Sequence, residues 1–218
     1  NHMIIMPDAD LDKAADALIG AGYGAAGERC MAISVAVPVG EATADALIER
    51  LVPKIEKLKV GPYTAGDDVD FGPVITKASQ DRINRLIASG VDQGADLVVD
   101  GRGLSIQGYE NGFFCGPSLF DRVTPEMEIY KEEIFGPVLT QVRTQSYDEA
   151  LKLVMDGDGL ALSKRRIERV ARRERLVIDH LGGDAMLLCE AQPRGVGPVA
   201  DHRSNRRAGN LLQPLTRS

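Results

Sequence analysis

The sequence predicts an α/β fold in which a mostly parallel sheet is flanked by helices. Apolar residues recur with helical spacing in four segments, and three short segments rich in β-branched and aliphatic residues alternate with them. The 218 residues are 44% hydrophobic and 27% charged, which is typical of a globular protein with one sizeable core. No internal repeat is visible, so one domain with an appendage is the simplest organisation.

The first helix is expected directly after Asp8 and Asp10, which can cap it, and Gly20 and Gly22 are expected to stop it. Its apolar residues are Leu11, Ala14, Ala15, Leu18 and Ile19. A short strand within residues 33–39 is expected next. The following helix has its apolar residues between positions 47 and 55. Since proline removes a backbone donor and clashes with the preceding turn, Pro53 is expected to kink or divide this helix.

The remaining elements of the predicted sheet follow in the same alternation. A third helix is expected over about residues 78–90. Residues 97–99 predict a buried strand that ends at Asp100-Gly101. Residues 138–142 predict another strand, and residues 148–155 another helix. Strands that alternate with helices in this way favour parallel pairing.

The composition changes abruptly after residue 156. Residues 1–156 carry 14 Lys and Arg against 25 acidic residues, whereas residues 157–218 carry 11 Arg and one Lys against seven. We therefore expect a folded domain over 1–156 and an arginine-rich tail over 157–218. Three interpretations of this tail stay open. It could form a basic helix over 165–173 followed by loose chain, it could be a patch that binds an anionic surface, or it could be translated from a shifted reading frame. Because the tail is rich in Arg, Pro and Gly with almost no Lys, we favour the frame shift over a nucleic-acid-binding arm.

Several classes of protein are not expected. No run of eighteen apolar residues occurs, and the N-terminus lacks the basic and apolar segments of a signal peptide. The cysteines Cys30, Cys115 and Cys189 are too few and too scattered for a disulfide framework, and no pair has metal-ligand spacing. We therefore expect no membrane partner, no metal and a reducing, cytoplasmic location.

Residues 22–27, Gly-Tyr-Gly-Ala-Ala-Gly, fit the dinucleotide-binding pattern G-x-G-x-x-G. That pattern binds a pyrophosphate only where a strand precedes it and a helix opens from it. Here a predicted helix precedes the glycines and no strand does. We interpret them instead as positions where the backbone approaches its neighbours closely on the way to Cys30.

Cys30 is the strongest candidate for a reactive side chain. It follows Gly27-Glu28-Arg29, between the glycine-rich turn and a predicted strand, and the guanidinium of Arg29 would favour the thiolate, which is the nucleophile. A single cysteine is often only a small buried hydrophobe. Cys115, which follows two phenylalanines, fits that second interpretation, and Cys189 has no informative context.

Two motifs give the chain a resemblance to aldehyde dehydrogenases. Residues 1–11 resemble the segment that follows the family's Gly-Gly-Lys motif, and Gly27-Glu28-Arg29-Cys30 lies where the family places its catalytic cysteine. Residues 133–138, Glu-Ile-Phe-Gly-Pro-Val, match the family's E-x-F-G-P motif. The Arg before the nucleophile is similar to the CoA-acylating methylmalonate-semialdehyde branch. The resemblance covers about residues 1–156 and implies a truncated catalytic domain of this family.

The resemblance implies NAD-dependent oxidation of (methyl)malonate semialdehyde to an acyl-CoA through a cysteine thioester, with CoA as co-substrate. Cys30 would attack the aldehyde carbon, and its backbone N–H, with an asparagine from a part outside this chain, would stabilise the oxyanion. Arg29 would hold the substrate carboxylate. Glu133 would bind the nicotinamide-ribose hydroxyls, and Phe135 would pack beside the nicotinamide. Without the resemblance, Arg29 and Glu133 could be ordinary surface charges.

The chain also departs from the family. The dinucleotide-binding region that precedes the family's cysteine is absent, and nothing matches after Met155. We therefore expect little or no activity from this chain alone, although intact members of the family are expected to act on small aldehydes as homo-oligomers. The alternative function is a non-catalytic interaction module whose basic tail binds an anionic partner.

Overall fold

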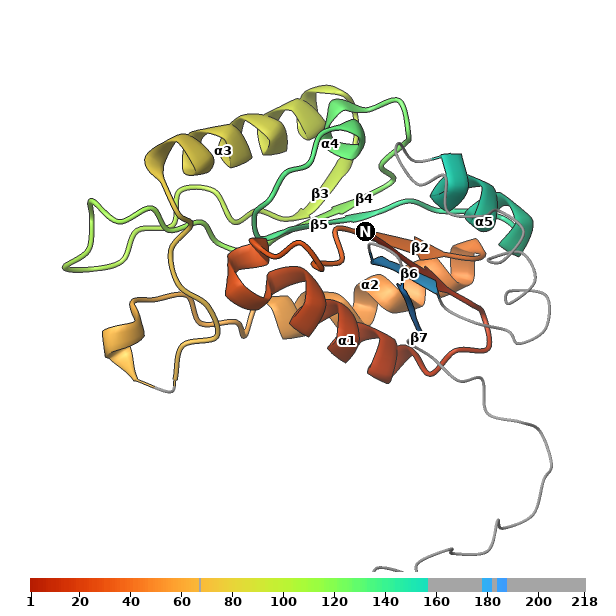
Figure 1. Cartoon of the computed structure of the whole chain (residues 1–218), viewed down its shortest axis with the longest axis horizontal. Helices are drawn as coiled ribbons and strands as arrows, with labels where there is room; N and C mark the ends of the chain where they lie inside the picture. The colour runs from red at the N-terminus through yellow and green to blue at the C-terminus, as the bar shows by residue number, and fades with distance from the viewer. Residues whose placement is uncertain (67, 157–177, 182–183, 188–218) are drawn as a thin grey trace, which may run out of the picture.

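The computed structural model describes residues 1–66, 68–156, 178–181 and 184–187. A five-stranded sheet with the order β1-β2-β5-β4-β3 runs through the molecule (Figure 1). Its strands are β1 (His2–Ile5), β2 (Val35–Pro38), β3 (Asp96–Val99), β4 (Ser118–Asp121) and β5 (Val138–Gln141). All neighbouring pairs are parallel except the antiparallel pair of β3 with β4. The predicted mostly parallel α/β sheet is therefore confirmed.

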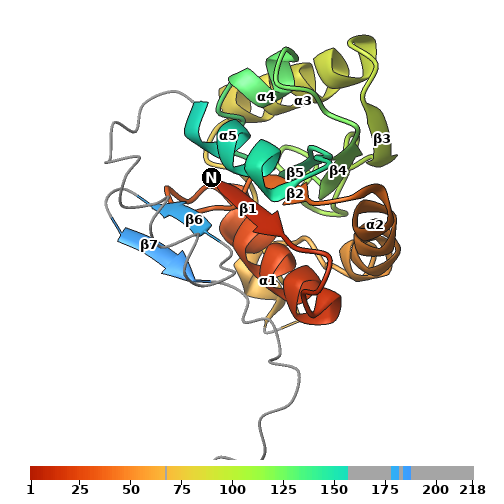
Figure 2. The ribbon, with the colours of Figure 1, turned by 90° about the vertical axis from the view of Figure 1, so that its right-hand side faces the viewer.

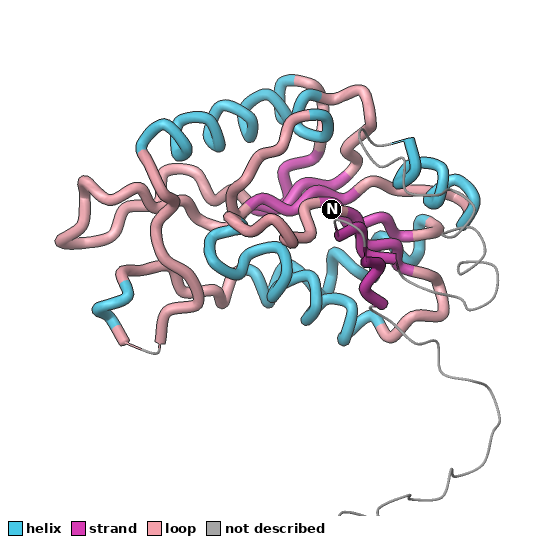
Figure 3. Tube along the Cα trace, viewed as in Figure 1, coloured by secondary structure: helices cyan, strands magenta, loops and turns pink. Residues whose placement is uncertain are grey.

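Helices cover both faces of this sheet. The helices are α1 (Leu11–Tyr23), α2 (Glu41–Ile55), α3 (Lys77–Asp92), α4 (Glu128–Lys131) and α5 (Tyr147–Asp156), with short 3₁₀ turns at η1 (Gly24–Gly27) and η2 (Tyr63–Ala65). Helices α1 and α2 lie on one face, and α3, α4 and α5 lie on the other (Figures 1 and 2). A hairpin of β6 (Ile178–Leu181) and β7 (Asp184–Leu187) lies beside β1 (Figure 2). Long loops gather at the opposite end of the molecule (Figure 3).

The core lies between the helices and the three central strands. Every residue of β2, β4 and β5 is buried, as expected for parallel strands that are covered on both faces. Leu119 of β4 and Leu139 of β5 are completely buried. This rigid centre fixes the segments that precede β2 and β5, which carry the candidate site.

The first helix begins as predicted but ends later. Asp10 caps α1, because its side chain accepts a hydrogen bond from the Lys13 N–H at 3.2 Å. The predicted stop at Gly20 and Gly22 is wrong, since the helix continues to Tyr23. Tyr23 is buried, and its hydroxyl donates to the Ser118 carbonyl at 2.9 Å, so this packing outweighs the weak helix propensity of two glycines.

Two further details of the predicted elements need correction. Pro53 does not divide α2, because it lies two residues before the helix end and removes only the hydrogen bond to the carbonyl of the exposed Glu49. The strand at 97–99 forms as β3, but it is an edge strand and not a buried one. Its Val98 side chain is 37% exposed. Strands β1 and β4 and helix α4 were not predicted.

Candidate active site

Cys30 lies in a turn between η1 and β2. The turn is closed by a hydrogen bond from the Ala32 N–H to the Arg29 carbonyl at 3.1 Å. The Asn1 side-chain amide donates to the carbonyls of Cys30 and Ala32, at 3.2 Å each, and ties the turn to the start of β1. Cys30 is exposed, and within the described part of the chain its backbone N–H has no hydrogen-bond acceptor. The turn therefore presents both a thiol and a free amide donor.

The glycine-rich segment before Cys30 makes close contacts with neighbouring residues, as interpreted from the sequence. It follows helix α1 and lacks the strand that a phosphate-binding loop requires. The guanidinium of Arg29 lies over Gly24, where a Cβ would be only 2.7 Å from Nη2. Gly27 has φ +68°, and a Cβ there would overlap the carbonyl oxygen of Gly136. Gly27 thus brings the Cys30 segment directly against the E-I-F-G-P turn.

The E-I-F-G-P turn leads into β5 and presents two side chains outward. Glu133 and Phe135 are exposed, whereas Ile134 between them is buried. Phe135 has φ +50°, a left-handed conformation that non-glycine residues seldom adopt. Arg82 of α3 donates hydrogen bonds to the carbonyls of Glu133 and Ile134, the latter at 2.7 Å.

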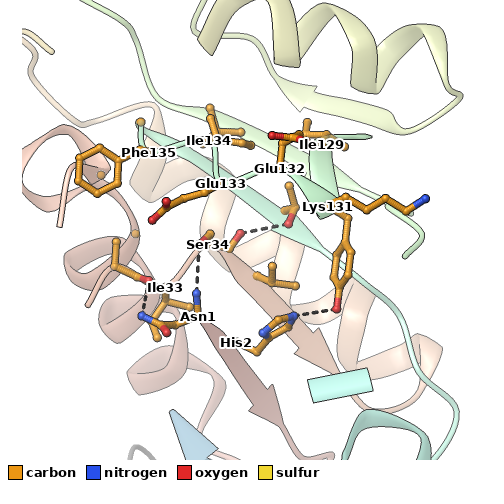
Figure 4. A pocket seen from close by; sticks show the side chains of 18 of the residues that line it. Asn1, His2, Ile33, Ser34, Ile129, Lys131, Glu132, Glu133, Ile134 and Phe135 are labelled. Atoms are coloured by element: carbon orange, nitrogen blue, oxygen red, sulfur yellow. Dashed lines mark hydrogen bonds between the residues drawn. The ribbon is translucent and has the colours of Figure 1, made fainter. Parts of the chain in front are cut away.

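A pocket of about 520 Å³ brings all four candidate residues together. Figure 4 labels two of them, Glu133 and Phe135. Its walls are the Cys30 segment, the start of β1, and the segment from α4 to the start of β5. The candidate residues Arg29, Cys30, Glu133 and Phe135 all line it. In the same pocket, His2 Nε2 and the Tyr130 hydroxyl lie 2.9 Å apart. These three walls precede or begin β2, β1 and β5, so they lie at the amino ends of these parallel strands, and Leu153 and Val154 of α5 complete the lining.

Cys115 is unlike Cys30. It is buried, and this burial, with the negative charge of Glu28, raises its pKa to about 11 against the opposing effect of Lys77. A thiol that is buried and protonated at neutral pH is a poor nucleophile. The interpretation of Cys115 as a core residue is confirmed. Cys189 lies outside the described residues, as does the predicted basic helix over 165–173.

Several residues of the site were missed by the sequence analysis. Asn1, which holds the Cys30 turn, carries no local signal for that role. Arg82 occupies an ordinary polar position of an amphipathic helix, so its contact with a turn 51 residues away could not be read from the pattern. The pair of His2 and Tyr130 joins positions 128 residues apart. Each contact depends on how the strands are ordered in the sheet.

Within the described residues, no helix is long and apolar enough to cross a membrane. Nor does that part of the chain contain a cluster of three or more His, Cys, Asp or Glu side chains that could hold a metal ion.

Comparison with known proteins identifies related enzymes. Malonate-semialdehyde dehydrogenase of Pseudomonas aeruginosa is 60% identical over 168 residues, which are 76% of this chain and 34% of that protein. The human mitochondrial acylating methylmalonate-semialdehyde/malonate-semialdehyde dehydrogenase is 45% identical over 167 residues, 74% of this chain and 30% of that protein. The chain thus spans about a third of the length of these curated relatives.

Solved structures give the same result. A Sinorhizobium meliloti protein assigned as a methylmalonate-semialdehyde dehydrogenase, and complexed with NAD, is similar with a TM-score of 0.73 and 59% identity, over 82% of this chain and 37% of that one. Residues 1–161 match the profile of the aldehyde dehydrogenase family. The extent of that match, together with the exposed cysteine and the adjoining E-I-F-G-P turn, shows that this chain belongs to the aldehyde dehydrogenase family.

Proposed function

We propose that this chain supplies the nucleophile and one side of the cofactor site for NAD-dependent oxidation of malonate or methylmalonate semialdehyde to an acyl-CoA. The observation that carries the proposal is that Cys30 shares a pocket with Glu133 and Phe135, through the contact of Gly27 with Gly136. Similarity to enzymes named for these two semialdehydes supports the substrate class.

Cys30 is suited to attack an aldehyde carbon. Its thiol is exposed in the pocket, so an aldehyde can approach it. After the thiol has lost its proton to water, attack by the thiolate forms a carbon–sulfur bond and moves the carbonyl π electron pair onto oxygen. The Cys30 N–H, which has no acceptor within the described residues, is free to donate to that oxyanion. Because the same residue provides nucleophile and donor, their relative placement is fixed by the backbone.

The residues around the pocket fit the nicotinamide end of NAD. Phe135 presents a ring that is 37% exposed, and a flat exposed ring is a suitable surface for an aromatic base. The Glu133 carboxylate comes from the same turn and can accept hydrogen bonds from ribose hydroxyls (Figure 4). When bound, NAD supplies the acceptor for the hydride that leaves the aldehyde carbon, and CoA supplies the thiol that takes the acyl group. A cytoplasmic, homo-oligomeric enzyme is part of the same proposal.

Arg29 is the proposed carboxylate-binding residue. Its exposed guanidinium lines the pocket one residue before the nucleophile. In an intact enzyme with the same Gly-Glu-Arg-Cys sequence, we expect the equivalent Arg→Met substitution to lower kcat/KM for carboxylated semialdehydes by roughly ten- to a hundredfold, which corresponds to the loss of a charged hydrogen-bonded pair. Simple aldehydes should be little affected. An equal loss for both substrate types would mean that Arg29 acts on Cys30 or on folding.

The test of the proposed function is the appearance of NADH with methylmalonate semialdehyde and CoA. We expect no turnover from the 218-residue chain alone, since the residues that would anchor the rest of the dinucleotide are not among those of its pocket. The informative enzyme is a chimera in which residues 1–156 replace the matching segment of the Pseudomonas aeruginosa relative. This chimera should be active.

The matched control uses the second cysteine. Activity of the chimera should disappear in Cys30→Ala and persist in Cys115→Ala, because, of these two cysteines, Cys30 lines the pocket and Cys115 does not. Activity that survives the loss of Cys30 would contradict the proposal. So would an inactive chimera that is nevertheless folded and binds NAD.

A further inference from the structure

We propose that Arg82 is a positioning residue that fixes the backbone of residues 133–135, and so places Glu133 and Phe135 for the cofactor. The inference rests on the proposed function for the identity of that cofactor. It adds a residue of α3 that lies outside the pocket and outside both recognised motifs. The argument has three steps, which concern the guanidinium, the turn and the adjoining packing.

The first step is the geometry of the Arg82 side chain. Two different nitrogens of its half-buried guanidinium donate to two successive carbonyls: Nη1 to Glu133, and Nη2 to Ile134 at 2.7 Å. A guanidinium is planar and its donors form a rigid fork. Binding two consecutive carbonyls with one fork therefore fixes the directions of the two peptide groups that flank Ile134.

The second step is that the turn has little else to hold it. Within the described residues, none of the amides of residues 133–136 has a hydrogen-bond acceptor, so the carbonyl bonds to Arg82 are the hydrogen bonds of the 133–135 backbone. Glu133 and Phe135 are exposed, which leaves Ile134 as the one buried side chain of the three. The left-handed φ of Phe135 must also be maintained by its surroundings.

The third step is the packing next to Arg82 on α3. Ile83 lies against Gly136, where an added Cβ would be 2.5 Å from the Ile83 Cδ1. Gly136 in turn lies against Gly27, three residues before Cys30. One turn of α3 therefore determines where the E-I-F-G-P turn sits relative to the nucleophile. Arg82 sets the orientation of its two outward side chains.

The kinetic test uses the chimeric enzyme with Arg82→Met, Arg82→Lys and the control Arg85→Met. Arg85 is an exposed arginine on the same helix that pairs with Glu128 at 2.6 Å and does not touch the turn. We expect Arg82→Met to raise the KM for NAD about tenfold, because the charge-assisted hydrogen bonds are lost. Arg82→Lys should raise this KM less. The KM for the semialdehyde should stay within about twofold, since Cys30 and Arg29 are unchanged.

A merely structural role would give a different pattern. Partial unfolding would lower kcat per mole of protein and leave the KM for NAD unchanged, and that result would overturn the proposal. An equal rise in KM for Arg85→Met would overturn it as well, because a general loss of positive charge or of α3 stability would then suffice. If Arg82→Met does not fold, the smaller rise in KM expected for Arg82→Lys takes its place.

A second measurement on the 218-residue chain is independent of the catalytic function. Chymotrypsin should cleave after Phe135 at least about fivefold faster in Arg82→Met than in the unsubstituted chain or in Arg85→Met, because local opening of the turn exposes the bond. Unchanged cleavage would overturn the positioning role. If the unsubstituted chimera shows no Cys30-dependent NADH formation, the proposed function fails, while this cleavage assay still decides whether Arg82 holds the turn.

Discussion

The two ends of the parallel strands contrast sharply. At their amino ends lie the exposed Cys30 and the outward-facing Glu133 and Phe135, around a pocket. At their carboxyl ends, Arg143 is 9% exposed and contacts three carboxylates. These contacts are to Asp121 at 2.5 Å, Glu41 at 2.6 Å and Asp45 at 2.8 Å. One end is open and presents reactive groups, and the other is closed by an ion-pair cluster.

This contrast shows that a high density of charged side chains does not mark the candidate active site. Open α/β sheets commonly bind ligands beyond the carboxyl ends of their strands, where the Arg143 cluster lies here. Yet the buried carboxylate of that cluster already has its hydrogen bonds, because Asp121 accepts from Arg143, from Gln141 and from the Arg122 N–H. Its role is to join α2 to strands β4 and β5. The exposed cysteine and the pocket around it are at the amino ends.

The largest loss of stability is expected when the ion-pair cluster around Arg143 is disrupted. Arg143→Met removes one cation and leaves the carboxylate of Asp121, which is 8% exposed, without its ion-pair partner. We expect a loss of roughly 3–5 kcal/mol in the free energy of unfolding, measured by urea denaturation. The control Arg50→Met, which breaks an exposed pair with Asp12, should cost under about 1 kcal/mol. Equal losses in the free energy of unfolding would contradict the difference between the buried cluster around Arg143 and the exposed pair of Arg50 with Asp12.

The next effect comes from the contact between the two motifs at the open end. Gly27→Ala introduces a Cβ that overlaps the carbonyl of Gly136, at a residue whose φ is +68°. Gly66→Ala is the matched control, since Gly66 has φ +88° with nothing within 4 Å of an added Cβ. We expect the free energy of unfolding, measured by thermal denaturation, to fall by about 1 kcal/mol for Gly66→Ala and by at least about 2 kcal/mol for Gly27→Ala. Similar values would mean that the contact can relax freely.

The smallest effect is a dependence of stability on pH at the closed end. Burial of Asp121 acts to raise its pKa, but hydrogen bonds from Arg143 and the Arg122 N–H outweigh this and lower it. The folded pKa is thus below the unfolded one. The stabilisation is therefore present above the unfolded pKa and lost as the pH falls through the folded pKa. Unfolding of Asp121→Asn between pH 7 and pH 3 should show a shallower decline, and an unchanged decline would contradict this assignment.

Local sequence patterns predicted the elements whose signal is contained in the element itself. Helices α1, α2, α3 and α5 follow their apolar stripes. Strand β1, four residues at the start of the chain, and β4, where Ser118 and Asp121 flank two apolar residues, lack a distinctive pattern. The edge position of β3 depends on strand order, which no local pattern encodes.

The sequence predicted only those residues of the candidate site that lie in a recognisable motif. Cys30, Arg29, Glu133 and Phe135 lie in two short motifs, and the structure brings those motifs together. Arg82 could not be found in this way, because its partners are backbone carbonyls, which leave no residue type to recognise. The cluster around Arg143 could not be predicted either, because its carboxylates come from α2 and β4, which are far apart in the sequence.

The most direct test of the central claim compares the two thiols of the described chain. In the 218-residue protein with Cys189→Ala, alkylation by iodoacetamide near pH 7.5 should modify the exposed Cys30 first. Cys115, whose pKa is raised to about 11, should stay unmodified until the protein unfolds or the pH approaches that value. Peptide mapping that finds Cys30 modified before Cys115 is the predicted result. Modification of Cys115 first, in protein that is still folded, would contradict the assignment of Cys30 as the nucleophile.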